Sequence, residues 1–519
     1  MKRRKFIQTS TAAAVGTPIM LNGLSLNVLP TKGFFKKMNP LNDKCLVIIQ
    51  MLGGNDGLNM VIPIDQYDNL ANARPNIILP ENSLLDLNGL TGLHPAMTGL
   101  KGLYDNARLT VVHSAGYPSQ NRSHFRSTDI WTSASAANEF VSSGWLGRYF
   151  DTKFPGYPNG YPNVENKNPV ALTMSSLVSE TCQGSASNFS LALTNPFSLS
   201  ALNQGEDSEP PNTPYGDELR FLRQAIDQTN AYNDVITGAA KHGKNMVSYP
   251  NTSLGNQLKN VALLLAGGLH TKVFVCSIGG FDTHANQVDV NDTKVGNHAN
   301  LLRTLSDAIA AFQEDLFQLG LEERVLGMTF SEFGRQIKSN FSDGTDHGTA
   351  APMFLFGKCV SAGFVGENPE ISANVQVQEG VPMQNDFRNI YGSIMRDWFE
   401  VEEEDVRELL FEDFEYYQVV DPCSSPGKFA GQAPIEAFDL NVFPNPVIDN
   451  AEAVFESFDE DARITLVDGR GAELRVLMEG RLYAGTHRVP VEASRLPRGN
   501  YYVRVQLEGR QQTKLFVKI

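Results

Sequence analysis

The sequence predicts an α/β domain followed by a small all-β sandwich. Four nearly continuous apolar runs, a pattern typical of strands buried on both faces of a parallel sheet, occupy residues 44–52, 109–113, 272–278 and 325–328. An amphipathic segment at 300–319 lies between the last two runs, and this strand–helix–strand order predicts a parallel pair with a right-handed crossover. Beyond Phe438, short alternating segments separated by glycine turns predict a β-sandwich.

The composition is that of an ordinary globular protein. Hydrophobic residues make up 41% and charged residues 19% of the 519 residues. A chain of this length forms roughly two to four domains. The net charge of −15 disfavours nucleic-acid binding, which needs a basic surface. An acidic surface suits a bound cation and an ordinary solvated surface equally well.

The first 30 residues are expected to be an export signal. Arg3 and Arg4, followed by Lys5-Phe6-Ile7, resemble the twin-arginine pattern of proteins that fold before crossing a membrane. The stretch that follows lacks the ~20 consecutive apolar residues of a spanning helix, and no later stretch supplies them. We therefore expect no transmembrane segment in the mature chain. The exported protein would pass through the periplasm and then be secreted or displayed at the cell surface.

The rest of the chain divides where its character changes. We expect a main domain at 40–420, a linker at 421–435 and the β-sandwich at 436–519. The linker carries the Pro and Gly residues that are common in such segments.

Five cysteines without CxxC spacing exclude a thioredoxin-like motif and a zinc knuckle. Cys45 and Cys276 fall in apolar runs, which predicts buried thiols. Cys182 and Cys423 lie in loop-like sequence and could pair in an oxidising compartment.

A candidate carboxylate follows the first apolar run, which ends in Gly53-Gly54-Asn55-Asp56-Gly57. Ligand sites of open α/β sheets lie at the carboxyl ends of strands, where the loops converge. The glycines permit a tight turn that presents Asp56 at that end. Since the same residue types also form ordinary turns, Asp56 is equally well interpreted as a ligand and as a turn residue.

A serine flanked by arginines follows the second run. Ser123 precedes a predicted helix that contains Ile130 and Trp131. A serine at this place is most often an N-cap, and spacing alone favours that interpretation. The same position also exposes a hydroxyl to the positive end of the helix dipole, where Arg122 and Arg126 suit a phosphate or sulfate group.

The third run repeats the arrangement of the first. Paired glycines lead into Asp282 and, two residues later, His284. A carboxylate and a neutral imidazole at this spacing can both be ligands of a zinc-type site.

The fourth run opens a strand–loop–strand segment at 325–357. Glu332 stands at the end of its first strand, and Asp346-His347 stands at the entrance to the second, at 353–356. These residue types suggest a metal-assisted hydrolytic site.

The remaining segments contain fewer candidate functional residues. Residues 154–214 predict surface loops, and helices are predicted at 219–236 and 386–410. Trp131, Trp145 and the aromatic stretch at 154–161 could border a sugar site, although aromatic residues more often belong to a core.

The C-terminal region resembles a known secretion signal. Phe443-Pro444-Asn445-Pro446, Gly499-Asn500-Tyr501-Tyr502 and the closing stretch 514–519 are similar to the C-terminal sorting domain of type IX secretion. The resemblance implies that the type IX machinery is a partner and that the tail is often removed.

The main domain resembles a bacterial family, the domain-of-unknown-function family 1501. The resemblance extends over nearly all of 40–420, and its motifs are GGND at 53–56, RSHF at 122–125, GGFDTH at 279–284, SEFGR at 331–335 and TDHG at 345–348. That family is grouped with the alkaline phosphatase and sulfatase superfamily. The resemblance therefore implies a three-layer α/β/α sandwich of the alkaline-phosphatase-like type and one or two divalent metals.

The resemblance also implies roles for individual residues. Ser123 takes the place of the nucleophile, with substrate-binding residues Arg122, His124 and Arg126. One metal would be held by Asp282, His284 and His347, and a second by Asp56 and Glu332. Phe333 stands where a metal-binding histidine is expected. The cofactor would be zinc or calcium, as one ion or two.

Two hypotheses of different class follow. The first is a secreted metal-dependent hydrolase of phosphate or sulfate esters, with a small-molecule or glycan ester as substrate. The second is a catalytically inactive cell-surface binding or scaffold protein on the same fold. Fold alone cannot decide between them, because one fold hosts many functions.

Overall fold

A computed structural model describes most of the chain. It covers residues 43–197, 209–421, 423, 440–457, 460–468, 473–482, 485–507 and 510–519, together with the paired strands β1 (Ile19–Leu21) and β2 (Leu24–Leu26). Most of the predicted export signal, including Arg3 and Arg4, and most of the predicted linker lie outside the described residues. The chain divides into two compact units, Met1–Val420 and Asp421–Ile519. Among the described helices, none combines the length and the apolarity needed to cross a membrane.

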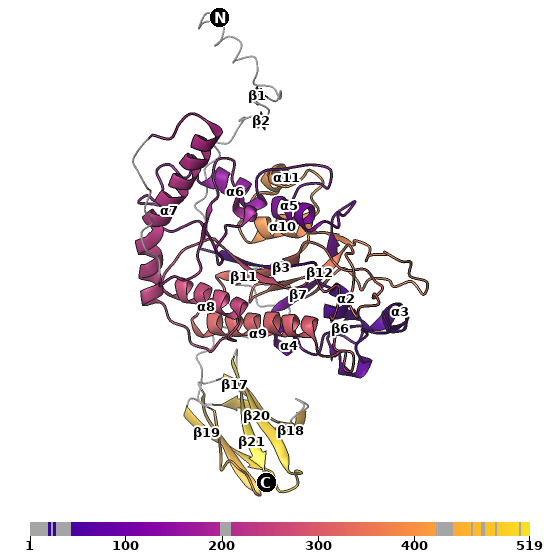
Figure 1. Cartoon of the computed structure of the whole chain (residues 1–519). Coiled ribbons are helices and arrows are strands. Elements are labelled where there is room, and N and C mark those ends of the chain that lie inside the picture. Colours follow the sequence, from indigo (N-terminus) through magenta and orange to yellow (C-terminus); the bar gives the residue numbers. More distant parts are fainter. Residues whose placement is uncertain are drawn as a thin grey trace, which may run out of the picture. The chain divides into compact units, whose positions relative to one another are not determined.

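A mixed β-sheet forms the centre of the first unit (Figure 1). From one edge to the other its strands are β13 (Gly363–Val365), β7 (Leu109–Gly116), β12 (Ala351–Phe356), β11 (Val325–Ser331), β3 (Cys45–Leu52), β10 (Val273–Gly279), β8 (Ala171–Thr173) and β9 (Ser190–Ala192), with β14 (Asn385–Asp386) beside β7. Among these strands only β12 is antiparallel to its neighbours. The carboxyl ends of β3, β7, β10 and β11 therefore lie at the same edge of the sheet as the amino end of β12.

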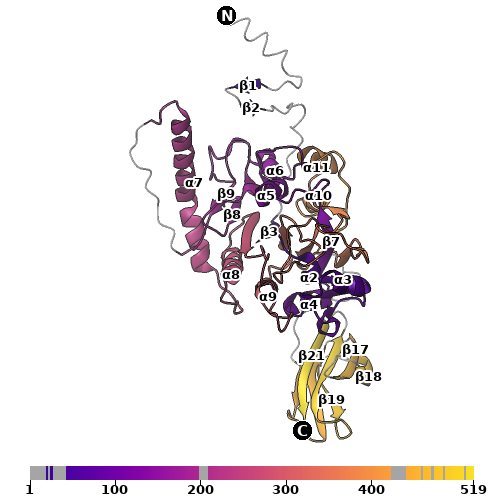
Figure 2. The same cartoon turned by 45° about the vertical axis from the view of Figure 1, so that its right-hand side comes forward.

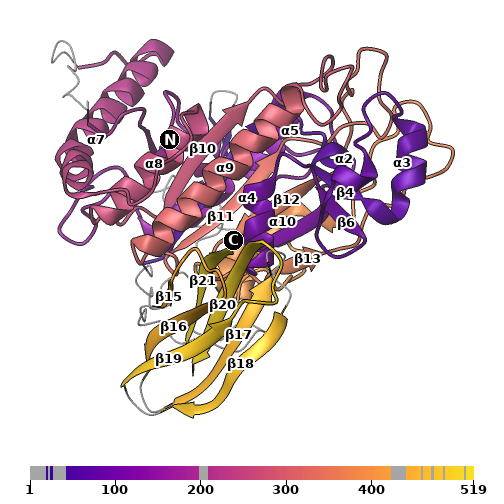
Figure 3. The same cartoon turned by 90° about the horizontal axis from the view of Figure 1, so that it is seen from below.

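Helices cover both faces of this sheet. One face carries α4 (Thr98–Asp105), α8 (Ser253–Ala266) and α9 (Asn297–Gln318), which Figure 3 shows in front of the strands. The other face carries α5 (His124–Ser133), α6 (Trp145–Lys153), α10 (Phe387–Asp397) and α11 (Glu403–Leu409) (Figure 1). The long helix α7 (Pro214–His242) stands beside α8 (Figure 2) and shares its apolar cluster. The predicted three-layer α/β/α sandwich is confirmed.

The central strands form where the sequence is apolar on both faces. In β3 every residue except Gln50 and Leu52 is buried. On one face its side chains join the cluster made with α4, α8 and α9. On the other face the Trp398 indole N–H donates a hydrogen bond to the Cys45 carbonyl over 3.1 Å.

The two tryptophans considered for a sugar site belong to this core. Trp131 stacks between Phe330 and Phe387, with ring centroids 5.6 and 4.1 Å away. Trp145 stacks on Tyr391 at 4.4 Å, and both indoles are buried. The sugar-site interpretation of these two residues is therefore wrong, and the interpretation as core holds.

Two other expectations need correction. The helix predicted at 386–410 is two helices, because Glu400 adopts φ 57°, a left-handed conformation that interrupts a helix. The segment 154–214, predicted as surface loops, contributes β8 and β9 to the edge of the sheet. In addition, α7 begins before the predicted residue 219, because Thr213 accepts a capping hydrogen bond from the Gly216 N–H and Pro214 suits the first helical turn.

The cysteines do not pair as expected. Cys182 is a free and buried thiol, whereas Cys359 and Cys423 are disulfide-bonded. Cys45 and Cys276 are free and buried, as predicted, and burial raises the pKa of Cys45 to about 12.

Short elements complete the first unit. A three-stranded sheet is formed by β4 (Val61–Pro63), β6 (Thr91–Leu93) and β5 (Leu85–Asp86). Around it lie α2 (Gly57–Met60), α3 (Tyr67–Ala73), η1 (Ile64–Gln66) and η2 (Glu81–Ser83), and η3 (Glu180–Cys182) precedes β9.

The second unit is a β-sandwich, as predicted. One sheet contains β15 (Asn441–Phe443), β16 (Asn450–Ser457) and β19 (Gly485–Glu492). The other contains β18 (Glu473–Leu482), β17 (Glu460–Asp468), β20 (Gly499–Leu507) and β21 (Arg510–Lys518). Buried residues of both sheets form one apolar cluster.

Candidate metal centre

Four side chains from distant parts of the chain meet at the edge where the strand ends converge. Asp282 and His284 follow β10, His347 precedes β12, and His124 is the first residue of α5, after β7. We call these four residues the ligand cluster. The antiparallel direction of β12 brings His347 to this edge, because the loop before that strand lies where the loops after its neighbours lie.

Three imidazoles surround one carboxylate oxygen. Asp282 Oδ1 lies 3.1 Å from His284 Nε2, 3.3 Å from His347 Nε2 and 3.7 Å from His124 Nε2. Ligand atoms about 2.0–2.2 Å from one tetrahedral ion lie roughly 3.3–3.6 Å from each other. His124, Asp282 and His347 each offer one possible ligand atom, and these three atoms lie within 4.8 Å of one another. The spacing of His124, Asp282 and His347 is thus compatible with a metal site, and His284 lies next to these three residues.

The second nitrogen of each imidazole is held by an acceptor. His347 Nδ1 lies 2.9 Å from the Arg122 carbonyl, His284 Nδ1 lies 2.7 Å from Asp346 Oδ1, and His124 Nδ1 lies 2.9 Å from Glu332 Oε1. Carbonyl and carboxylate oxygens only accept hydrogen bonds, so each Nδ1 carries the proton. In the neutral rings each Nε2 is then an unprotonated lone pair, the form that binds metals.

These lone pairs face one another. His284 Nε2 and His347 Nε2 are 3.0 Å apart, and both lie beside the Asp282 carboxylate. Two unprotonated nitrogens cannot hydrogen-bond each other, so either a proton or a bound cation must lie between them. The donor set of imidazole nitrogens and one carboxylate therefore fits a divalent cation.

Arg335 anchors the carboxylate of the cluster. Its guanidinium is buried and donates to Asp282 Oδ1 over 2.7 Å and to the carbonyls of Gly53, Gly54, Phe281 and Thr345. Partial burial acts to raise the pKa of Asp282, but Arg335, His347 and His284 outweigh it and hold that pKa below its usual value. Burial lowers the pKa of His347, against the opposing effect of the Arg122 carbonyl and the Asp282 carboxylate beside its ring nitrogens. Both shifts favour the deprotonated forms, which are the metal-binding forms.

Asp56 lies in a different environment. It is buried, and Arg74 Nη1 donates to both of its oxygens over 3.1 and 2.9 Å. Gln287 Nε2 donates to Asp56 Oδ2 over 2.7 Å. Burial acts to raise the pKa of Asp56, but Arg74, His298 and Gln287 hold it below its usual value. The structure therefore pairs Asp56 with an arginine and does not bring it into the ligand cluster.

Glu332 supports the cluster from behind. Its Oε1 accepts hydrogen bonds from the Gly53 N–H over 2.8 Å and from His124 Nδ1. Glu332 thus orients His124, and its predicted role as a ligand of a second metal stays a prediction.

Phe333, next in the chain, is buried with its ring 4.9 Å from that of His124 and 4.6 Å from that of His347. A Cβ at Gly54 would lie only 2.1 Å from this ring. The place where a further histidine ligand was considered is therefore filled by an apolar ring.

Ser123 lies at the start of α5 beside the cluster. Its side chain is exposed and makes no capping hydrogen bond, although Ser123 occupies the N-cap position. Arg122 exchanges hydrogen bonds with His347, since its Nη1 donates to the His347 carbonyl over 3.2 Å and its own carbonyl accepts from His347 Nδ1. Ser123 and Arg122 therefore stand next to two ligands, His124 and His347.

Arg126 is engaged elsewhere. Its Nη2 donates to the carbonyls of Ala136, Ala137 and Glu139, and its guanidinium stacks on Phe140 at 4.0 Å. Arg126, which was predicted to bind substrate, thus holds the loop after α5 in place.

Sequence reasoning missed three roles in this region. His124 was assigned to substrate, and Arg335 and Gln287 were not singled out. The only available signal was position, because His124 and Arg335 fall within motifs at strand ends.

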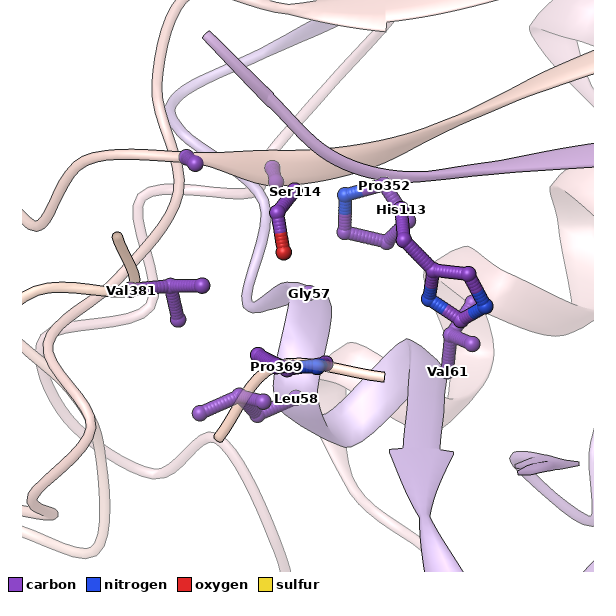
Figure 4. A pocket seen from close by; sticks show the side chains of 10 residues that line it. Gly57, Leu58, Val61, His113, Ser114, Pro352, Pro369 and Val381 are labelled. Carbon is purple, nitrogen blue, oxygen red and sulfur yellow. The ribbon is translucent and has the colours of Figure 1, made fainter. Parts of the chain in front are cut away.

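A small pocket near the same edge contains none of the predicted site residues. Its walls are mostly apolar and its volume is about 20 Å³, room for about one water molecule. The hydroxyl of Ser114 points into it, and His113 lines it (Figure 4). That hydroxyl is buried and has no hydrogen-bond partner within the described part of the chain, and Ser114 has φ 46°. This pocket is too small to be the site of an ester substrate.

Comparison with solved structures finds distant similarity to several proteins. An alkaline phosphatase superfamily protein from Vibrio parahaemolyticus is 9% identical, covers 99% of this chain and 88% of its own, and gives a TM-score of 0.31. A putative sulfatase from Bacteroides fragilis is 8% identical, with coverages of 89% and 92% and a TM-score of 0.33. A phosphonate monoester hydrolase from Silicibacter pomeroyi is 8% identical, with coverages of 91% and 89% and a TM-score of 0.32. Similarity at this level carries no argument about the site.

Comparison with protein families is more informative. No curated protein matches the chain. Residues 441–519 match the family described as secretion system C-terminal sorting domain, which implies export by the type IX machinery and a surface or secreted location. Residues 108–396, more than half of the chain, match the family described as protein of unknown function DUF1501. Asp56 lies outside this match, and the whole ligand cluster lies within it. The chain therefore belongs to the DUF1501 family.

Proposed function

We propose that the protein is an exported hydrolase of phosphate or sulfate esters that depends on one divalent metal ion. The observation that carries the proposal is the convergence of three imidazole Nε2 atoms on Asp282 Oδ1, with each Nδ1 proton held by an acceptor. Imidazole nitrogens with one carboxylate suit zinc or a similar transition metal, whereas calcium takes oxygen ligands. Of the two cofactors considered, zinc is the better match.

One ion rather than two is favoured by the surroundings of the cluster. The ligands considered for a second ion are otherwise engaged, Asp56 by Arg74 and Glu332 by His124. Phe333 offers no ligand atom. We therefore expect a stoichiometry of one metal per chain.

Ser123 is the proposed nucleophile. Its hydroxyl is exposed and free of a capping bond at the start of α5, where helix N–H groups lack intrahelical partners and can bind the oxygens of an anionic ester. Arg122 adds a positive charge beside it. The Ser123 oxygen would form a bond to phosphorus or sulfur as the bond to the leaving alcohol breaks, and the serine proton would go to the oxygen of that alcohol. Water would then attack the same phosphorus or sulfur, break its bond to Ser123, return a proton to the serine and release phosphate or sulfate. A bound cation would favour the deprotonated hydroxyl and offset negative charge on the ester oxygens.

The test begins with the purified full-length protein. Its metal content is measured by inductively coupled plasma mass spectrometry. Aryl phosphate, phosphonate and sulfate esters are then screened before chelation, after chelation and after metal is restored. We expect about one zinc-like ion per chain and hydrolysis of at least one ester class that chelation abolishes. Absence of bound metal and of cleavage with any added divalent ion would favour the inactive binding protein instead.

Ser123→Ala separates catalysis from metal binding. This variant should lose turnover by a factor of at least about 1000, the scale expected when an activated nucleophile is removed, while its metal content stays at the wild-type level. Ser142→Ala, which removes another exposed hydroxyl, is the matched control and should behave as the wild type. Retained turnover in Ser123→Ala removes Ser123 as the nucleophile.

A further inference from the structure

The two turns that carry the ligands are in direct contact. Residues 282–287 follow β10 and residues 342–347 precede β12. The Thr345 N–H donates to the Thr283 carbonyl over 3.1 Å, and the Gln287 N–H donates to the Asp343 carbonyl over 2.8 Å. A Cβ at Gly344 would lie 2.5 Å from the carbonyl of His284, so glycine lets the two backbones meet.

The side chain of Gln287 joins the same turns a second time. Its Oε1 accepts hydrogen bonds from the hydroxyls of Thr283 over 2.9 Å and Thr345 over 2.8 Å. Thr283 lies between the ligands Asp282 and His284, and Thr345 lies two residues before His347. All three side chains of this contact are buried, with Gln287 fully inaccessible. One amide oxygen thus bridges the two ligand-bearing turns.

Asp56 fixes the orientation of this amide. An ionised carboxylate only accepts hydrogen bonds, so the Gln287 NH₂ must face Asp56 and its oxygen must face the threonines. Asp56 is kept ionised in the interior by Arg74, which also donates to the carbonyls of Gln336 and Ile337. A series of hydrogen bonds therefore runs from Arg74 through Asp56 to Gln287 and ends at the two turns that carry the ligands.

We propose that Gln287 is a positioning residue, held by Asp56, that sets the separation of the two ligand turns and thereby the affinity and geometry of the metal site. This inference rests on the proposed metal site. The proposal also explains how Asp56, which follows β3, can support the metal site without contacting a metal. Groups that orient metal ligands from behind typically change metal affinity 10–100-fold when they are mutated.

The test uses Co²⁺ as a spectroscopic probe in the full chain. Gln287→Ala should raise the Co²⁺ dissociation constant about 10–100-fold and change the visible absorption spectrum, because the geometry of the ligands changes. The same dissociation constant and spectrum as in the wild type would overturn the proposal.

A charge substitution tests the hydrogen-bonding logic. Gln287→Glu removes the N–H donor that faces Asp56 and places a second acid against that carboxylate, so it should weaken Co²⁺ binding. Co²⁺ affinity at the wild-type level in Gln287→Glu counts against the proposed role.

The chain offers a matched control in Gln313. This glutamine of α9 is buried, and its amide has no hydrogen-bond partner among the described residues. Gln313→Ala removes the same buried group away from the turns, so the Co²⁺ dissociation constant and spectrum should not change. An effect equal to that of Gln287→Ala would show a general loss of stability rather than positioning.

Hydrogen exchange separates this inference from the proposed function. In metal-free protein, Gln287→Ala should speed amide exchange in peptides covering 282–287 and 342–347 at least about tenfold relative to the wild type, and Gln313→Ala should not. If the wild type binds no metal, the proposed function fails, and this measurement still decides whether Gln287 holds the turns. Unchanged exchange in both peptides refutes the positioning role.

Discussion

Two polar groups lie behind the same sheet edge and differ in how their charges are satisfied. The ligand cluster is half exposed, and its Nε2 lone pairs face each other and a carboxylate. The second group, which we call the buried network, consists of Asp56, Arg74, Gln287 and His298. In it each donor meets an acceptor, since Arg74 pairs with Asp56 and His298 Nε2 and Nδ1 bond Asn55 and Asn59.

The difference lies in what each group lacks. The buried network is complete without any added ion, because an arginine already neutralises its acid. In the ligand cluster, three ring nitrogens face one carboxylate oxygen, and Arg335 forms an ion pair with that carboxylate from the buried side. Asp56 and Asp282 both follow a strand that ends in paired glycines. Asp56 forms a neutralised ion pair with Arg74, whereas Asp282 belongs to a set of possible metal ligands. The neighbouring side chains account for the difference.

The largest effect on stability is expected when the arginine of the buried network is removed. Arg74→Met leaves the Asp56 carboxylate buried without its partner and should lower the free energy of unfolding by about 3–5 kcal/mol. Urea unfolding of the chelated protein measures this change. Lys101→Met, which breaks an exposed ion pair with Asp105, is the control and should cost less than about 1 kcal/mol. Equal effects of the two variants would contradict the description of the network as a buried closed pair.

The next effect is expected in the ligand cluster. His347→Ala should weaken metal binding about 100-fold or more, which corresponds to about 2.7 kcal/mol, because one of the converging lone pairs is removed. Equilibrium dialysis against zinc measures the loss. His270→Ala, which removes an exposed histidine paired with Asp43, should bind zinc as the wild type does. Wild-type affinity in His347→Ala would exclude this cluster as the metal site.

The smallest effect concerns pH. Burial lowers the pKa of His298 to about 4, below the ordinary value near 6.5 that it regains on unfolding. Between these values the unfolded chain binds a proton that the folded chain does not, so stability is full above pH ~6.5 and falls as the pH drops towards 4. From pH 7 to 5 this costs on the order of 1–2 kcal/mol. Thermal unfolding with a chelator should show the fall, and His298→Leu should make its slope shallower. An unchanged slope would argue against a neutral buried imidazole.

Much of the fold could be predicted because it rests on local pattern. The strands β3, β7, β10 and β11 coincide with apolar runs, and the helix expected at 300–319 is α9, Asn297–Gln318. The predicted helix at 386–410 was wrong because one residue, Glu400, adopts a left-handed conformation that periodicity does not reveal. Strands of three residues, such as β8 and β9, are too short to show a pattern.

The site was less accessible to sequence reasoning. Asp282, His284 and His347 were expected together, and the structure brings them together. The role of His124 was not foreseen, because its Nδ1 is oriented by Glu332, which is more than 200 positions away in the chain. Arg74 had no signal either, since nothing local links it to Asp56. Pairings of this kind are set by tertiary packing, which the sequence of either segment does not contain.

Phe333 also affects the electrostatics of the ligand cluster. Its buried ring lies against His124 and His347 and keeps water from one side of the ligands. Charges about 4 Å apart attract each other with about 1 kcal/mol in water and about 4 kcal/mol at the effective dielectric constant near 20 found close to protein surfaces. The apolar ring therefore strengthens the attraction between a cation and the cluster on the side that it covers. Affinity for the ion should then fall less with added salt than it would at a fully exposed set of ligands.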